Sequence, residues 1–238
     1  MGIDGQIRKD PVVVLASVRA AAMAGDIRAQ ALYAQMHCEG RSVVCDPAEG
    51  LHWYTLAANS GHAFAMNMVG RCHELGRGTM ANAELAAAWY RKAAAAGLDW
   101  GMYNLANLLA TGRGVNTDRA GALRWYRRAA ELGHAKSMNM VGRHYEEGWE
   151  AERNPRAALD WYRKSAHGGD FRGQASYAAI LAQTGHVDEA GHWLLRAAET
   201  GTHAFLEHLG GELAESPHAV LRGIGVQMRA RAAMTAHA

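Results

Sequence analysis

The 238-residue sequence lacks the features that would place it in several large classes of protein. No uninterrupted apolar run approaches the 18 residues or so that a membrane-spanning helix needs, so no membrane span is expected. Its 25 basic and 23 acidic residues leave a formal charge of +2, and no segment is rich in Lys and Arg. We therefore expect no nucleic-acid partner, because such proteins carry a strongly basic face.

Cysteine is also scarce, with Cys38, Cys45 and Cys72 only. An odd number does not suggest a disulfide framework, although Cys38 and Cys45 flank a predicted loop and could pair under oxidising conditions. With His37 and His52 they could be imagined as metal ligands, but zinc sites favour two pairs at tight spacing. We expect no metal and no cofactor.

Catalytic motifs are missing as well, despite thirteen histidines. There is no Gly-rich phosphate loop after a strand, no His-Glu-x-x-His and no Gly-x-Ser-x-Gly. No acidic residue recurs beside His62, His73 or His134 in the way that a base and its orienting partner would require. We expect a non-enzymatic protein; the alternative, a small hydrolase or ligand-binding enzyme, would require turnover that is lost on changing a single histidine.

What the sequence does contain is a strict repeat of 36 residues. A chain with this period is a stacked array of helical units, and such arrays usually bind other molecules rather than catalyse. The repeating columns are Trp53-Tyr54, Trp89-Tyr90, Trp125-Tyr126 and Trp161-Tyr162; Gly25, Gly61, Gly97, Gly133 and Gly169; Gly40, Gly76, Gly112 and Gly148; and Ala22, Ala58, Ala94, Ala130 and Ala166.

Each unit is predicted to open with a capped helix. One column consists of Asp or Asn, whose side chains accept hydrogen bonds from the unpaired N–H groups at a helix start. In three units proline follows, which suits a first helical position where no N–H is needed. The capping column is Asp10, Asp46, Asn82, Asp118 and Asn154.

The unit after Asp118 shows the expected helix lengths. A first helix runs about fifteen residues to Gly133, and a second runs from about Ala135 to Glu147 and stops at Gly148. Apolar residues recur at spacings of three and four, so the Trp and Tyr columns are predicted to pack between units. A column of small residues would leave room for these rings: Gly70, Ala106, Gly142 and Ala178.

The two ends depart from the period, as terminal units do. The segment Pro11-Val-Val-Val-Leu-Ala16 superficially resembles a short signal sequence, but it lies in register with the repeats and is predicted to be the first helix of a terminal half-unit. We therefore expect a cytoplasmic protein. Near the other end the loop around Thr184-Gly185-His186 has lost four residues, so the step from Trp161 to Trp193 is 32 residues.

A last helix is predicted to begin at Ser216-Pro217 and to cover the exposed core of the final unit. Its apolar side comprises Val220, Leu221, Ile224 and Met228. The predicted organisation is a tail over 1–9, a solenoid over 10–214 with units near 10–45, 46–81, 82–117, 118–153, 154–185 and 186–214, and a capping helix and tail over 215–238.

Two stretches carry a resemblance to a known family. Gly133-His-Ala-x-Ser-Met-Asn-Met-Val-Gly142, and Met102-Tyr-Asn-Leu-Ala106 with the columns that follow it, resemble the Sel-one-like repeat, a 36-residue relative of the tetratricopeptide repeat. The resemblance covers nearly the whole chain. It implies an all-α fold, a right-handed superhelix of antiparallel helix pairs. Similar proteins with cysteine-rich repeats carry one disulfide per unit, whereas most units here have no cysteine.

The resemblance also implies where a partner would bind. In the related superhelices the helix that opens after the Gly-x-Ala column lines the concave face, so its non-core positions are the candidate partner-binding residues. Spacings of three and four place each set on one face. The candidates are Phe64, Asn67, Arg71 and Glu74; Trp100, Tyr103 and Asn107; and Lys136, Asn139, Arg143 and Glu146.

Two interpretations of these candidates are open. Asn side chains can pair with a peptide backbone, Arg can hold a carboxylate, and Trp100 and Tyr103 offer apolar area. Alternatively, Asn67 and Asn139 satisfy neighbouring backbone groups, and the Arg and Glu residues form weak exposed pairs. Family members are mostly adaptors, so the main hypothesis is a protein- or peptide-binding adaptor or scaffold; the alternative is an immunity-type inhibitor of one cognate enzyme.

Overall fold

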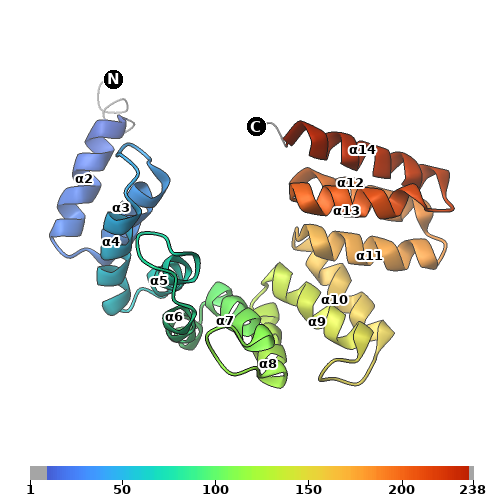
Figure 1. The fold of residues 1–238 in the computed structure, drawn as a ribbon, viewed down its shortest axis with the longest axis horizontal. Helices are drawn as coiled ribbons and strands as arrows, with labels where there is room; N and C mark the ends of the chain where they lie inside the picture. The colour runs from blue at the N-terminus through green and yellow to red at the C-terminus, as the bar shows by residue number, and fades with distance from the viewer. Residues whose placement is uncertain (1–9, 236–238) are drawn as a thin grey trace, which may run out of the picture. The chain divides into compact units, whose positions relative to one another are not determined.

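The computed structural model describes residues 10–235, so the predicted 1–9 tail lies outside the described residues. Within 10–235 the chain forms thirteen α-helices and no strand (Figure 1). The first helices of the repeats are α2 (Pro11–Met23), α4 (Pro47–Asn59), α6 (Ala83–Ala95), α8 (Arg119–Glu131), α10 (Pro155–His167), α12 (Val187–Thr200) and α14 (Ala219–Thr235). The second helices are α3 (Ile27–Glu39), α5 (Ala63–Leu75), α7 (Asp99–Thr111), α9 (Ala135–Glu147), α11 (Phe171–Gln183) and α13 (His203–Ala214).

The predicted helix caps are confirmed. All five side chains of the capping column accept a backbone N–H at 2.7–3.1 Å, and Asp118, for example, accepts from Gly121. Each such bond stabilises a helix by about 1 kcal/mol, because an otherwise unpaired donor finds an acceptor. The predicted second helix from Ala135 to Glu147 is confirmed as well.

The loop after each of α3, α5, α7 and α9 turns through two residues in the left-handed region. The first is the C-cap glycine, such as Gly148 with a φ of 74°. The second is Gly114 after α7, and a Cβ there would lie 2.3 Å from the carbonyl carbon of Ala83 at the start of α6. At the same position of other repeats, Ser42 and Glu150 adopt φ values of 63° and 54° without being glycine. The loop after α7 therefore lies directly on the first turn of α6.

The tyrosines of the Trp-Tyr column form the centre of the core. Tyr54, Tyr90, Tyr126 and Tyr162 are all buried. The ring of Tyr90 lies against Gly70 of α5, where a Cβ would come within 2.7 Å of it. Tyr162 lies on Gly142 of α9 in the same way, at 2.6 Å. At these two positions of the small column the rings come this close because glycine has no side chain.

The tryptophans of the same column lie at the edge of the core rather than inside it. Trp53, Trp89, Trp125 and Trp161 are half-buried, and Trp53 packs edge-on against Tyr33 of α3 with ring centroids 5.2 Å apart. The ammonium groups of Lys92 and Lys164 lie over Trp89 and Trp161, 4.0 and 4.4 Å from the ring centroids. The indole rings thus lie at the edge of the core, where cations cover two of them.

The C-terminal helices follow the predicted plan with one exception. The shortened connection between α11 and α12 is present at residues 184–186. Helix α14 buries Leu221, Ile224 and Met228, three of the four residues of its predicted apolar side, in a core shared with α11 and α12. Val220 is exposed, contrary to prediction, because it lines an open groove beside α12 instead of the core.

The three cysteines are free thiols that lie close together. The thiol of Cys45 donates to the backbone carbonyl of Cys38 at 3.6 Å. A hydrogen bond with Cys38, together with burial, raises the pKa of the Cys72 thiol, and the same bond lowers the pKa of Cys38. Over residues 10–235 no group of three or more His, Cys, Asp or Glu side chains is arranged to hold a metal ion.

The chain divides into two compact units. The first includes the described residues up to Trp125, with α2 to α7, and the second runs from Tyr126 to the end of α14. The division falls within α8, between the two residues of a Trp-Tyr pair.

Candidate functional site

The candidate residues fall into both units, so they form two separate sets. Those on α5 and α7 belong to the first unit, and those on α9 belong to the second. Within each set the structure separates residues that hold helices together from residues that are accessible to a partner.

Two candidate asparagines connect successive second helices. Asn67 is buried, and its Oδ1 accepts a hydrogen bond of 2.8 Å from Nδ2 of Asn104 on α7. In the second unit Asn139 is also buried, and its Oδ1 accepts from the hydroxyl of Ser176 on α11 at 3.3 Å. Because both acceptors are already used, these asparagines position neighbouring helices. Asn104 and Ser176 were not predicted, and the 37-residue offset that places them opposite Asn67 and Asn139 is a usable signal.

The two candidate glutamates accept from the buried tyrosines. Glu74 accepts the hydroxyl of Tyr90 at 2.5 Å and forms an ion pair with Arg113 in the loop after α7. Glu146 accepts the hydroxyl of Tyr162 at 2.6 Å. Burial, followed by these hydrogen bonds, raises the pKa of both tyrosines, so both phenols stay protonated. Glu74 and Glu146 therefore satisfy buried hydroxyl groups.

The accessible part of the first set is aromatic and basic. Phe64 and Trp100 are exposed, and the Trp100 ring stands edge-on to Tyr103 with centroids 6.2 Å apart. Arg71 is exposed one turn after Asn67, and Tyr103 and Asn107 are half-buried. This surface, Phe64, Arg71, Trp100 and Tyr103, is named the α5–α7 face. It has the residue types that anchor protein interfaces.

The accessible part of the second set lies at the end of α9. The guanidinium of Arg143 lies over the ring of Trp149, 5.4 Å from its centroid, and both residues are exposed. Lys136, at the start of α9, is half-buried. Trp149 was not among the candidates, although it is a tryptophan outside the Trp-Tyr register in a polar loop. That mismatch is the signal that could have identified it.

His144 holds the loop that carries Trp149. Its Nδ1 donates to the carbonyl oxygen of Trp149 at 2.8 Å, and the two rings meet edge-on at 5.9 Å. The side chain is buried, and burial is the main reason that its pKa is lowered. The guanidinium groups of Arg127 and Arg143 lower the pKa further.

The lowered pKa predicts an acid-sensitive contribution to stability. The unfolded chain takes up a proton at His144 near its ordinary pKa of 6.5, before the folded chain does, so stability is lost as the pH falls below that value. Urea unfolding at pH 7.5 and pH 5.0 gives the decrease in the free energy of unfolding between the two pH values. This decrease should be smaller for His144→Leu than for the unaltered protein. Leucine fits this column, because Leu108 occupies it in the preceding repeat. An equal loss in both proteins would contradict the assignment.

The fold and these surfaces define a class of protein, an all-α helical repeat protein whose accessible aromatic and basic residues suit binding rather than catalysis. The Sel1 repeat model matches residues 27–62, 63–98, 101–134, 135–170 and 187–201. The chain therefore belongs to the Sel1 repeat family. Proteins of this family generally mediate protein–protein interaction and are typically non-catalytic.

Solved structures show the same fold. A Sel1 repeat protein from Oxalobacter formigenes is 24% identical, with a TM-score of 0.77 over 93% of this chain and 99% of the other. The protective antigen c5321 of uropathogenic Escherichia coli is 27% identical, with a TM-score of 0.74 over 95% of this chain and 50% of the other. The immunity protein PA5088 from Pseudomonas aeruginosa is 19% identical, with a TM-score of 0.58 over 79% and 74%. Comparison with curated proteins gives no match.

The predicted all-α architecture of helix pairs is confirmed by the structure and by these relatives. The first four matches of the family model begin at or near the starts of the second helices α3, α5, α7 and α9, and the fifth covers α12, whereas the units predicted above open at the first helices. A periodic chain can be divided at either point, so the predicted unit bounds stay a prediction. Among the described residues, no helix is long and apolar enough to cross a membrane.

Proposed function

We propose that this chain is a non-enzymatic adaptor or scaffold that binds another protein or a peptide through its second helices. The observation that supports this most directly is the α5–α7 face, where Phe64, Arg71 and Trp100 are exposed and Trp100 stands edge-on to Tyr103. Large aromatic side chains and arginine contribute most of the binding energy in protein interfaces, because they bury much area at little cost in conformational entropy. The Arg143–Trp149 pair offers the same chemistry in the second unit.

Within this proposal the candidate residues have two different roles. Asn67, Glu74, Asn139 and Glu146 hold the scaffold, because their side-chain oxygens accept hydrogen bonds from neighbouring helices. The partner would contact the exposed aromatic and basic residues instead. Binding along a concave groove remains part of the proposal, as does a cytoplasmic location, which the three free thiols support.

Affinity purification from the native host tests the α5–α7 face. The double variant Phe64→Ala, Trp100→Ala should bind the partner at least about 30-fold more weakly than the unaltered protein, since the loss of even one hot-spot residue costs about 2 kcal/mol. The matched control is Leu56→Ala, Leu85→Ala, because these side chains on α4 and α6 are 37% and 45% exposed, close to the 41% and 44% of Phe64 and Trp100. A partner retained equally by both double variants would rule out this face, and Arg143→Ala, Trp149→Ala would then test the second unit.

An immunity-type inhibitor of one cognate enzyme is the alternative function. The fold it requires is shared with the immunity protein PA5088 at a TM-score of 0.58, which makes the alternative compatible with this architecture. It predicts that the same purification yields a single enzyme in a tight one-to-one complex whose activity is blocked. Several weak partners without a toxic activity would favour the adaptor.

A further inference from the structure

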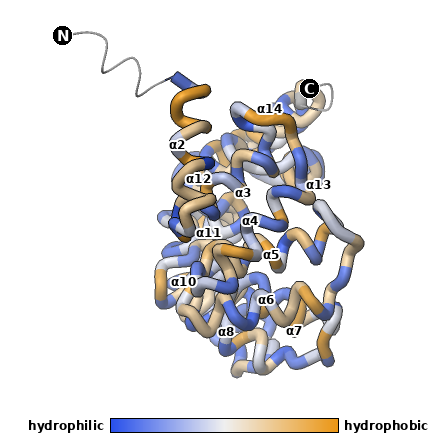
Figure 2. Tube along the Cα trace, turned by 90° about the vertical axis from the view of Figure 1, so that its left-hand side faces the viewer, coloured by the Kyte–Doolittle hydropathy of each residue, from blue (hydrophilic) through white to orange (hydrophobic). Residues whose placement is uncertain are grey.

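The first helix, α2, has an apolar outer side. Its inner side places Leu15, Val18 and Ala22 against a small core with Tyr33 and Met36 of α3. On the outer side, apolar residues follow one another at spacings of three and four and remain accessible; Val13 and Met23 are 43% and 67% exposed. In Figure 2 much of α2 has the colours of hydrophobic residues. This outer stripe comprises Val13, Ala16, Ala20 and Met23. An exposed apolar stripe of this kind marks an interaction surface.

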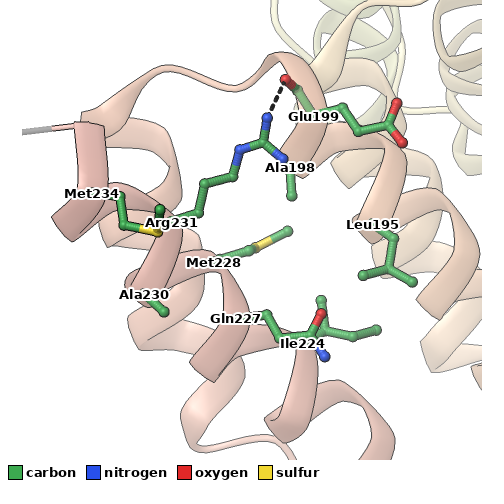
Figure 3. A pocket seen from close by; sticks show the side chains of 9 residues that line it. All are labelled: Leu195, Ala198, Glu199, Ile224, Gln227, Met228, Ala230, Arg231 and Met234. Atoms are coloured by element: carbon green, nitrogen blue, oxygen red, sulfur yellow. Dashed lines mark hydrogen bonds between the residues drawn. The ribbon is translucent and has the colours of Figure 1, made fainter. Parts of the chain in front are cut away.

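At the other end of the repeats, an apolar groove runs between α12 and α14, both in the second unit. Figure 3 shows its deeper part, with Leu195 on the α12 side and Ile224, Met228 and Met234 on the α14 side. The volume of this part is about 820 Å³. Arg231 also lines this part and donates to the backbone carbonyl oxygen of Glu199 at 3.1 Å.

The groove continues toward the start of α14. A second hollow, between Asp188 and His192 of α12 and Val220 of α14, shares Leu195 and Ile224 with the first. Gly223 leaves open space here, since a Cβ on it would meet nothing within 4 Å. The two hollows therefore form one continuous groove, named the C-terminal groove.

The dimensions of the outer stripe and of the C-terminal groove match. Helix α2 has 13 residues and α14 has 17, which corresponds to lengths of about 20 Å and about 25 Å. A single helix can therefore lie along the groove with its apolar stripe against Leu195, Ile224 and Met234.

Their charges match as well. Arg19 is the only ionisable residue within α2, and it is exposed. The α12 side of the groove presents Asp188 and Glu199, both exposed, while Arg231 is held by a backbone carbonyl. In a helix docked in the groove, Arg19 would therefore lie beside an acidic side, where a carboxylate is present near either end of α12.

We propose that the outer stripe of α2 docks in the C-terminal groove of a second copy of this chain. Stacking helix on helix is how the repeats bury their apolar faces, and α2 and α14 are the first and last helices of the described residues. A second copy can continue it, with different surfaces meeting on the two molecules. Such a contact joins copies head to tail. This proposal is independent of the adaptor function, because it uses neither the α5–α7 face nor the Arg143–Trp149 pair.

The test blocks one end of the molecule at a time. Sedimentation equilibrium of the full chain, from about 5 to about 500 μM, should show a mass that rises above the monomer value of 25.7 kDa. Val13→Glu blocks the helix and Leu195→Glu blocks the groove, so each variant alone should remain monomeric. An equimolar mixture should form a dimer of twice the monomer mass and grow no further, because one intact helix and one intact groove remain.

The matched control is Leu85→Glu, since Leu85 is 45% exposed on α6 and Leu195 is 42% exposed on α12. This control should self-associate like the unaltered protein. Formation of the dimer in the mixture also shows that both blocked variants are folded. A monomer at all concentrations, association that survives Leu195→Glu, or a mixture that stays monomeric would each overturn the proposal; the second result would indicate pairing of two α2 helices.

Discussion

Replacing Gly114 with alanine is expected to lower the free energy of unfolding by about 3 kcal/mol, and two separate costs add up to this value. Gly114 has a φ of 71°, which costs an alanine about 1 kcal/mol after the smaller entropy of the unfolded chain is taken into account. The new Cβ would also lie 2.3–2.6 Å from backbone atoms of Ala83 and Glu84. Backbone cannot rotate away as a side chain can, so the loop must shift, which costs about 2 kcal/mol more.

Gly97→Ala is the matched control for this prediction. Its φ of 86° carries the same backbone cost, but nothing lies within 4 Å of the position of its Cβ. Urea unfolding followed by circular dichroism should therefore show a loss of about 1 kcal/mol for Gly97→Ala, one third of the loss for Gly114→Ala. Equal losses would show that the loop does not rest on the start of α6.

Replacing Tyr90 with alanine is expected to cost about 4 kcal/mol, because the ring is fully buried and its removal leaves a cavity between α5 and α6. The hydroxyl accounts for part of this value. Tyr90→Phe should cost about 1–2 kcal/mol, since it removes the hydrogen bond to the Glu74 carboxylate.

Tyr54→Phe supplies the matched comparison. Tyr54 is equally buried in the same column, but its hydroxyl has no hydrogen-bond partner. In its repeat, Cys38 stands 16 residues before the tyrosine, where Glu74 and Glu146 stand before Tyr90 and Tyr162. Phenylalanine at position 54 should therefore be neutral or stabilising by up to about 1 kcal/mol, because an unpaired buried polar group is removed. A loss equal to that of Tyr90→Phe would contradict this reasoning.

Most of the fold could be predicted from the sequence because each repeat obeys local rules. The capping column and the C-cap glycines fix the helix ends through contacts within a few residues, so the bounds of α9 could be predicted to the residue. The Trp-Tyr column predicted which residues pack in the core, but periodicity does not show how deeply each side chain is buried. It placed tryptophan and tyrosine together, whereas only the tyrosines are fully buried.

The candidate site was less predictable, because burial and hydrogen bonding between repeats depend on side chains that are far apart in the sequence. Helical spacing placed Asn67, Arg71 and Glu74 on one side of α5 in the prediction. In the structure the side chain of Asn67 is hydrogen-bonded to Asn104, and that of Glu74 is hydrogen-bonded to Tyr90. Arg71 remains exposed. Trp149 was missed because it follows no column.

By itself the sequence determined the helices, their order and the repeat to which they belong, since these follow from hydrogen bonds and apolar spacing inside a 36-residue unit. Only the tertiary structure decided which polar side chains are used up in joining neighbouring units and which remain accessible. It also decided that the outer stripe of α2 and the C-terminal groove lie open. Those outcomes depend on the atoms that neighbouring helices bring together, and these atoms belong to residues distant in the sequence.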